Sequence, residues 1–365
     1  MDDFFIALPK VELHAHLSGS VSHATLRRLT DASNISNNAS SLDGRCFRTF
    51  SALHEIINTT EKVKSATTDV VEEFCSDGVV YLELRTTLRP LPSLEDYLDA
   101  VISGVLQSPS VIANLIDVRI LLSIDRTKGC DLAQKTTDML IHYGQRWPNL
   151  FVGLDVSGNP RCGTLLDFVP LLEQARKNNF RTTVHLAEIP QQEDEWWAFL
   201  QLHVPDRIGH GTCLPRPGTT GTPVATRVSA LIQMLRIPIE VCLTSNVVSN
   251  TVKDFEFHHA PAWIRNGHPI CICVGPFSVA CYINFERLMF VSIYINANML
   301  TDDKGLFDCT LSGELQALVK RCGVHSSQLR QIIENSIAAA FCSDSKKTEL
   351  AKKVALFFDS VMSLQ

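Results

Sequence analysis

The segment Val11-Glu12-Leu13-His14-Ala15-His16-Leu17 introduces the pattern that decides the fold. It is a short run of mostly apolar residues, typical of a strand that is buried on both faces. Seven similar runs follow, and several of them are separated by stretches with the apolar spacing of an amphipathic helix. The runs span residues 11–17, 79–87, 118–125, 152–156, 182–187, 207–211, 237–244 and 269–273, and the helical stretches span residues 68–76, 94–105, 132–143, 165–178 and 229–236.

Strands that alternate with helices predict a parallel sheet. Eight such units predict that the sheet closes into an α/β barrel of the TIM type, a (β/α)8 barrel, in a single domain that spans residues 1–365. A doubly wound open sheet is the alternative, but no Gly-x-Gly-x-x-Gly motif follows any of the runs. After Leu311 the apolar residues recur at intervals of three and four, as at Leu315, Leu318 and Cys322, so we expect extra C-terminal helices.

The composition excludes several classes of protein. Hydrophobic residues make up 45% of the 365 residues and charged residues 20%, which excludes a disordered chain. The 33 basic and 39 acidic residues give a net charge of −6, which disfavours a nucleic-acid polymer as a partner and leaves a small anionic substrate open. No basic segment precedes an apolar one at the N-terminus, and the 12 cysteines form no C-x-x-C pair. We therefore expect a cytosolic monomer with reduced thiols and no membrane association.

Polar and ionisable residues gather at the carboxyl ends of the expected strands, where barrel enzymes build their active sites. His14 and His16 are two positions apart in the first strand, so their side chains face the same side of the sheet. That spacing suits two ligands of one Zn²⁺ ion, although two hydrogen-bonded core histidines would share it.

Other strand ends supply further candidates. His185 and Glu188 end the fifth run, His210 ends the sixth, and Asp302 and Asp303 are expected to end the eighth. A metal hydrolase needs three or four ligands, an open position for water, a general acid or base and an electrophilic stabiliser. The residue types at these strand ends meet that list, so they predict a barrel of the metal-dependent hydrolase type.

Three motifs together resemble the adenosine deaminase superfamily. They are Leu8-Pro9-Lys10-Val11-Glu12-Leu13-His14-Ala15-His16-Leu17, Val184-His185-Leu186-Ala187-Glu188 and Ile208-Gly209-His210-Gly211. Residues 81–87, 122–126, 154–160 and 242–246 look more like the adenosine deaminase-like members of this superfamily, which are N6-methyl-AMP deaminases. The resemblance covers nearly the whole chain in the right order.

The resemblance implies a reaction and a role for each matching residue. The reaction is the zinc-dependent hydrolysis of N6-methyl-AMP to IMP and methylamine, in which zinc hydroxide attacks C6 of the purine. One Zn²⁺ ion per chain is implied, with His14, His16, His185 and Asp302 as its ligands. The implied catalytic residues are Glu188, which protonates purine N1, His210, which orients the zinc hydroxide, and Asp303, which pairs with purine N7.

The resemblance also implies a set of substrate-binding residues. They are His16, Ser18, His54, Thr86, Thr87, Leu88, Arg89, Asp125, Gly158 and Asp303. Ser18 stands where nucleoside-specific adenosine deaminases carry Asp and methyl-AMP enzymes usually carry Asn. A hydroxyl can donate to a 5′-phosphate that a carboxylate would repel, so Ser18 fits a nucleotide better. Two other functions stay open, namely deamination of adenosine itself and nucleotide binding by a catalytically impaired homologue.

One stretch departs from the family pattern. In the family a short strand continues directly into Cys-Thr-Asp-Asp, whereas here the apolar residues 274–300 separate Cys273 from Thr301. A gene-model artefact, such as a translated intron, would explain this insert. Alternatively the insert is real, residues 293–300 replace the eighth strand and residues 271–294 form a loop. If neither holds, Asp302 is out of position and the chain is the impaired homologue.

Overall fold

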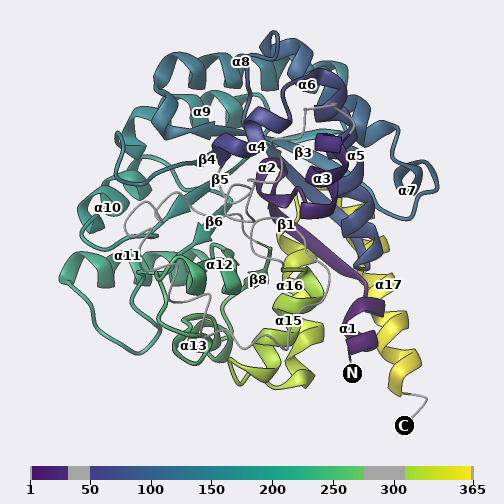
Figure 1. Cartoon of the computed structure of the whole chain (residues 1–365). Helices are drawn as coiled ribbons and strands as arrows, with labels where there is room; N and C mark the ends of the chain where they lie inside the picture. The colour runs from purple at the N-terminus through teal and green to yellow at the C-terminus, as the bar shows by residue number, and fades with distance from the viewer. Residues whose placement is uncertain (1, 32–49, 275–308, 363–365) are drawn as a thin grey trace.

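The computed structural model describes residues 2–31, 50–274 and 309–362. Eight parallel strands form one sheet in the order β1 to β8, and helices surround it (Figure 1). This architecture confirms the predicted (β/α)8 barrel of the TIM type with extra C-terminal helices. The strands are β1 (Lys10–His16), β2 (Val79–Thr86), β3 (Asp117–Asp125), β4 (Phe151–Ser157), β5 (Arg181–Leu186), β6 (Arg207–His210), β7 (Ile239–Val241) and β8 (Ile270–Ile272).

Strand β7 differs from its expected form, whereas β8 lies within its expected run 269–273. Strand β7 covers only part of residues 237–244, because helix α12 (Leu243–Val248) begins just after it. The Glu314 carboxylate accepts a hydrogen bond from the Thr244 N–H at 3.2 Å, in the first turn of α12, where free N–H groups favour a carboxyl group. The eighth position of the sheet is taken by Ile270–Ile272, which pairs with β7. Cys271 therefore lies in a strand, as the run 269–273 predicts, and not in a loop. Residues 293–300, the alternative for this strand, lie outside the described residues.

A carboxylate and a helix cover the seam between the first and the last strand. Within the described residues, backbone pairing links each strand to the next from β1 to β8 and does not link β8 back to β1. The buried Glu12 side chain instead accepts hydrogen bonds from the N–H groups of His14 (2.6 Å) and Val274 (2.7 Å). Helix α16 (Leu329–Ala339) packs on both β1 and β8. The C-terminal helices thus complete the barrel wall.

The remaining helices form the outer layer (Figure 1). Thr59 and Ser93 cap two of them by accepting hydrogen bonds from backbone N–H groups of the first turn. None of the helices in the described ranges combines the length and the apolar character that a membrane span needs. The helices are α1 (Asp2–Ala7), α2 (Leu17–Ser20), α3 (His23–Asp31), α4 (Phe50–Ile56), α5 (Thr60–Ser76), α6 (Leu94–Leu106), α7 (Pro109–Ile112), α8 (Cys130–Arg146), α9 (Val169–Lys177), α10 (Glu193–Leu202), α11 (Pro223–Leu235), α13 (Ala260–Arg265), α15 (Leu311–Lys320) and α17 (Asp344–Met362).

The contact between Glu314 of α15 and α12 makes stability depend on pH. Burial raises the pKa of Glu314 to about 7, above its ordinary value, so the folded state keeps the proton that the unfolded state loses as pH rises through about 4.5. The folded state therefore loses stability between about pH 4.5 and pH 7. We expect Glu314→Gln to reduce the fall in the free energy of unfolding over this pH range by about 2–3 kcal/mol. Urea unfolding of both chains at pH 5 and pH 8 measures the difference, and an equal pH dependence in the two chains would contradict the prediction.

Candidate active site

Four histidines from three strands meet at the carboxyl end of the barrel. His14 and His16 end β1, His185 lies near the end of β5, and His210 ends β6. The His14 ring centroid lies 4.6 Å from that of His185 and 5.0 Å from that of His210, and the His14 and His16 centroids are 5.4 Å apart. We call these four residues the histidine cluster. The structure thus brings together the histidines that the sequence places at strand ends.

The histidine cluster offers nitrogen atoms that nothing in the described protein satisfies. The Nε2 atoms of His14, His16 and His210 are buried and have no hydrogen-bond partner among the described residues. Candidate ligand atoms of His14, His185 and His210 all lie within 4.8 Å of one another, and the same holds for His16, Asp155 and His185. Burial lowers the pKa of His16 to about 3, so its ring is neutral and has a free lone pair. Neutral imidazoles around a common centre fit a metal ion such as Zn²⁺.

Buried carboxylates fix which ring nitrogen of two histidines faces the centre. His14 Nδ1 lies 2.6 Å from Glu240 Oε2, and His185 Nδ1 lies 3.2 Å from Asp155 Oδ1. An ionised carboxylate only accepts hydrogen bonds, so each Nδ1 donates, and Nε2 keeps its lone pair when the ring is neutral. Burial lowers the pKa of His14 well below its ordinary value, so its ring is neutral. Metal-binding histidines commonly have this kind of partner.

Two buried arginines hold these carboxylates in place. Arg85 donates from Nη1 to Asp155 Oδ1 at 3.0 Å and from Nη2 to Glu240 Oε2 at 2.5 Å. Arg207 donates from Nε to Glu240 Oε1 and from Nη2 to Glu83 Oε2, both at 2.5 Å. All five side chains are fully buried. Arg85 therefore couples the partner of His14 to the partner of His185, inside the barrel and below the histidine cluster.

Glu188 reaches the same centre from the loop that follows β5. Its side chain is only 4% exposed, and its Oε2 lies 3.8 Å from His210 Nε2. Ala187 (φ 57°) and His210 (φ 63°) both adopt the left-handed conformation, which is uncommon for residues other than glycine. Gly209 is also constrained, because a Cβ there would lie 2.9 Å from His14 Cε1. The chain is thus bent to bring Glu188 and His210 into the site.

Two consecutive histidines support His210 from behind. His259 Nε2 donates to the carbonyl oxygen of His210 at 2.9 Å. Asn246 on α12 links the rings of His210 and His258. Its Nδ2 lies 3.1 Å from His210 Nδ1, and its Oδ1 lies 3.3 Å from His258 Nε2. The rings of His258 and His259 stack with centroids 4.4 Å apart. Both the backbone and the ring of His210 are therefore held.

A family model for adenosine deaminase matches residues 9–273 and 287–356. The chain belongs to the adenosine deaminase family. Human N6-methyl-AMP deaminase is 35% identical over an alignment that covers 96% of this chain and 94% of the human protein. Two solved structures are similar, each at 28% identity. The ADAL–IMP complex has a TM-score of 0.80 and full coverage of both chains, and Arabidopsis N6-mAMP deaminase MAPDA has a TM-score of 0.78, with 98% of this chain and 99% of that one covered.

Part of the nucleotide-binding set expected for this adenosine deaminase family member lies together beside α4. The half-buried Arg89 donates from Nη2 to the carbonyl oxygens of His54 (3.3 Å) and Ile57 (3.2 Å). The Thr86 hydroxyl lies 2.8 Å from that of Tyr97, Thr87 is half-buried, and Leu88 is buried. Burial lowers the pKa of His54 to about 4, and the nearby Arg89 adds to the effect. The structure thus joins His54 to the segment that follows β2.

Other expected contacts lie at the ends of β1, β3 and β4. Ser18 is half-buried and belongs to helix α2, which begins directly after His16. Asp125 Oδ1 accepts a hydrogen bond from the Thr127 N–H at 2.9 Å and lies against Gly158. Gly158 has φ 96°, and a Cβ there would collide with Asp125, so the position requires glycine. Asp302 and Asp303 lie outside the described residues, so their expected roles stay predictions.

Sequence reasoning assigned no role to the buried partners of the histidine cluster in this adenosine deaminase family member. Arg85, Asp155 and Asn246 stand in motifs that resemble the family, but the sequence alone does not show what they touch. Glu240 is an acidic residue in an otherwise apolar run, and Glu83 is another. A carboxylate in a strand buried on both faces needs a charged partner, and this signal could have found them.

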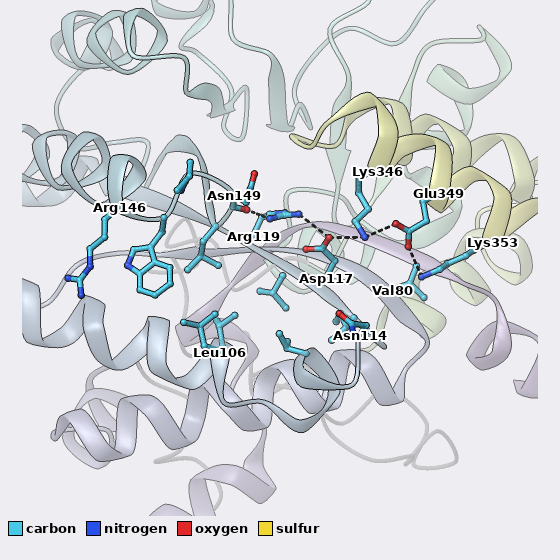
Figure 2. A pocket seen from close by; sticks show the side chains of 17 residues that line it. Val80, Leu106, Asn114, Asp117, Arg119, Arg146, Asn149, Lys346, Glu349 and Lys353 are labelled. Carbon is cyan, nitrogen blue, oxygen red and sulfur yellow. Dashed lines mark hydrogen bonds and ion pairs between the residues drawn. The ribbon is translucent and has the colours of Figure 1, made fainter.

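A cavity of 620 Å³ lies at the opposite end of the barrel (Figure 2). It is lined by residues at the amino ends of β2 and β3, by the loop before β4 and by α17. Several of its charged groups pair with one another: Lys346 contacts Asp117 (3.0 Å) and Glu349 (2.9 Å), and Arg119 contacts Asp117 (3.0 Å). None of the candidate site residues lines this cavity. Barrel enzymes place their chemistry at the other end, where the histidine cluster lies.

Proposed function

We propose that this chain is a zinc-dependent hydrolase that converts N6-methyl-AMP to IMP and methylamine. The observation that carries the proposal is the histidine cluster, with its unsatisfied Nε2 atoms beside Glu188 at the carboxyl end of the barrel. The human relative is named for the same reaction, and a structural neighbour holds IMP, the expected product. Both neighbours of known structure match nearly the whole chain.

The ligands of the ion would be His14, His16, His185 and Asp302. The unsatisfied Nε2 atoms of His14 and His16, and the carboxylate that orients His185, support three of them. When bound, Zn²⁺ lowers the pKa of a water molecule from 15.7 to about 7 and so supplies hydroxide at neutral pH.

The side chains of the protein would move protons and bind the purine. Glu188 is buried next to the histidine cluster, where it can take a proton from the attacking water and give it to purine N1 as oxygen adds to C6. It can then pass the proton of the new C6 hydroxyl to the amine as the C6–N bond breaks. His210, whose Nε2 lies 3.8 Å from Glu188 Oε2, would orient the attacking oxygen. The backbone of Gly158 would contact purine N3, and Asp303 would pair with purine N7.

The phosphate end of the substrate would lie near Ser18, Arg89 and His54. The hydroxyl of Ser18 adds no negative charge near a 5′-phosphate. The remaining expected contacts are His16, Thr86, Thr87, Leu88 and Asp125. We also propose that the chain acts as a monomer in the cytosol. The ten cysteines that the structure describes are all free, which supports the cytosolic location.

The test is turnover of N6-methyl-AMP by the full-length chain, followed by the ultraviolet change to IMP. We expect turnover that a chelator abolishes and added Zn²⁺ restores, and a faster reaction with N6-methyl-AMP than with adenosine. Turnover that survives complete metal removal would contradict the zinc assignment, and preference for adenosine would contradict the substrate assignment.

The same assay can compare the full-length chain with a chain that lacks the insert. The family model leaves residues 274–286 unmatched and matches residues 287–300, so it supports only the first half of the expected insert 274–300. A chain without residues 274–300 should be at least as active as the full-length chain if the insert is foreign to the fold. If both chains bind Zn²⁺ and neither releases IMP, the proposed function is wrong and the nucleotide-binding homologue is favoured.

A further inference from the structure

A line of hydrogen bonds leads from a backbone amide to the ring of His210. The N–H of Ala260, the first residue of α13, donates to His258 Nδ1 at 3.2 Å. His258 Nε2 lies 3.3 Å from Asn246 Oδ1, and Asn246 Nδ2 lies 3.1 Å from His210 Nδ1. All three side chains are almost fully buried, with 3% exposure or less. Water is therefore excluded from every junction of the line.

The first member of the line sets the direction of every bond in it. A backbone N–H can only donate, so His258 Nδ1 accepts and carries no proton. Burial lowers the pKa of His258 well below its ordinary value, and the nearby His259 and Arg216 add to this effect. The His258 ring is therefore neutral, and its one proton lies on Nε2. That N–H donates to Asn246 Oδ1, which leaves the amide NH₂ group of Asn246 directed at His210.

We propose that Asn246 and His258 are positioning residues that hold His210 in a single tautomer. Because Asn246 Nδ2 donates to His210 Nδ1, the ring proton of His210 lies on Nε2. This Nε2 is buried, has no hydrogen-bond partner among the described residues, and lies 3.8 Å from Glu188 Oε2. His210 thus presents an N–H to the centre of the site.

The other imidazoles at this centre have the opposite arrangement. The Nδ1 atoms of His14 and His185 face the carboxylates of Glu240 and Asp155, so in the neutral form of each ring the Nε2 atom presents a lone pair. The histidine cluster therefore contains two kinds of imidazole, which differ in whether Nε2 carries a lone pair or a proton. Two rings are prepared to bind a cation, and His210 is prepared to donate a hydrogen bond.

The kinetic consequence of this inference rests on the proposed function. An N–H aimed where negative charge develops on oxygen stabilises the transition state without rearrangement of the site. A His210 ring with the proton on Nδ1 would instead present a lone pair at that place, which would repel the oxygen or add a ligand to the ion. Asn246 and His258 need not touch the substrate for this effect.

The direct test is the tautomer of His210, which does not depend on turnover. The full-length chain labelled with [¹⁵N]histidine and stripped of metal gives long-range ¹H–¹⁵N spectra, in which protonated and unprotonated ring nitrogens have distinct shifts. The signals of His210 are those lost in H210Q. We expect protonation at Nε2 only. Protonation of wild-type His210 at Nδ1 would overturn the proposal, whatever the chain does to N6-methyl-AMP.

Variants then test each step of the line. N246D places an acceptor beside His210 Nδ1, so we expect that nitrogen to become protonated and kcat to fall by about 10–100-fold, with a smaller change in KM. H258L should leave His210 as a mixture of tautomers, whereas H258Q keeps an N–H donor toward Asn246 and should keep the wild-type signals. The control is H268Q, which alters a buried histidine that donates to the Ile237 carbonyl oxygen and stands outside the line.

The outcomes separate this inference from the proposed function. Unchanged His210 signals in both folded N246D and folded H258L would overturn the inference even if the enzyme is active. The expected tautomer and its reversal in N246D would support it even if N6-methyl-AMP is not the substrate. If N246D does not fold, the wild-type spectrum and the pair H258Q and H258L still decide.

Discussion

We expect the replacement of Glu188 by glutamine to lower kcat for N6-methyl-AMP by about 10²–10⁴-fold, the usual contribution of a general acid or base. Glutamine keeps the size and the hydrogen-bonding capacity of the side chain but cannot transfer a proton at neutral pH. Glu188 is buried within 3.8 Å of His210 Nε2, so no solvent group can easily take over its role. Steady-state kinetics with N6-methyl-AMP measure the effect.

The Glu188→Gln experiment has a control in the neighbouring helix. Asp194 is an exposed acidic residue in the first turn of α10, and Asp194→Asn should leave kcat unchanged. The bound zinc of Glu188→Gln should equal that of the parent chain, because Glu188 is not among the expected ligands. A Glu188→Gln chain that retains zinc and more than about a tenth of the parent kcat would show that another group moves the proton.

We expect the replacement of Glu240 by glutamine to lower both the free energy of unfolding and the affinity for the proposed metal ion. Glu240 accepts hydrogen bonds from Arg85 and Arg207 and orients His14, all without solvent. Removing the charge of one partner from a buried ionic network costs about 3–5 kcal/mol of the free energy of unfolding. Loss of the partner of a metal-binding histidine lowers metal affinity by about 10–100-fold. Urea unfolding and competition for Zn²⁺ with a chromophoric chelator measure the two effects.

Glu83 provides the matched control for Glu240. It is an equally buried carboxylate that also pairs with Arg207, but it contacts Tyr81 and the backbone of Phe341 instead of a histidine of the cluster. Glu83→Gln should therefore destabilise the fold by a similar amount and leave zinc affinity close to that of the parent chain. If both variants lose zinc affinity equally, Glu240 acts through overall stability and does not position His14.

Most of the fold could be predicted because strands buried on both faces leave a strong signal in the sequence. The apolar runs of β1 to β6 end within one residue of the observed strands. Strand β7 was predicted too long, because the contact that starts α12 comes from Glu314, far along the chain. The seam between β1 and β8 was also beyond prediction, since Glu12 meets Val274 only after the whole barrel has formed.

The parts of the candidate site that depend on the spacing of residues within one strand could be predicted. His14 and His16 share one face of a strand, and the strand-end positions of His185 and His210 place them at the same rim. Their partners could not be predicted, because the register of separate strands decides which carboxylate meets which ring. Asn246 shows this most clearly, since its role depends on His258 and on one backbone N–H of α13.

We propose that His14, His16, His185 and Asp302 hold one catalytic zinc ion. The most direct measurement is a titration of the metal-free, full-length chain with Zn²⁺, in which IMP formation from N6-methyl-AMP and bound zinc are followed together. We predict no activity without metal and a linear rise that ends at one zinc ion per chain. Full activity of the metal-free chain, or a rise that continues to two ions per chain, would contradict the account.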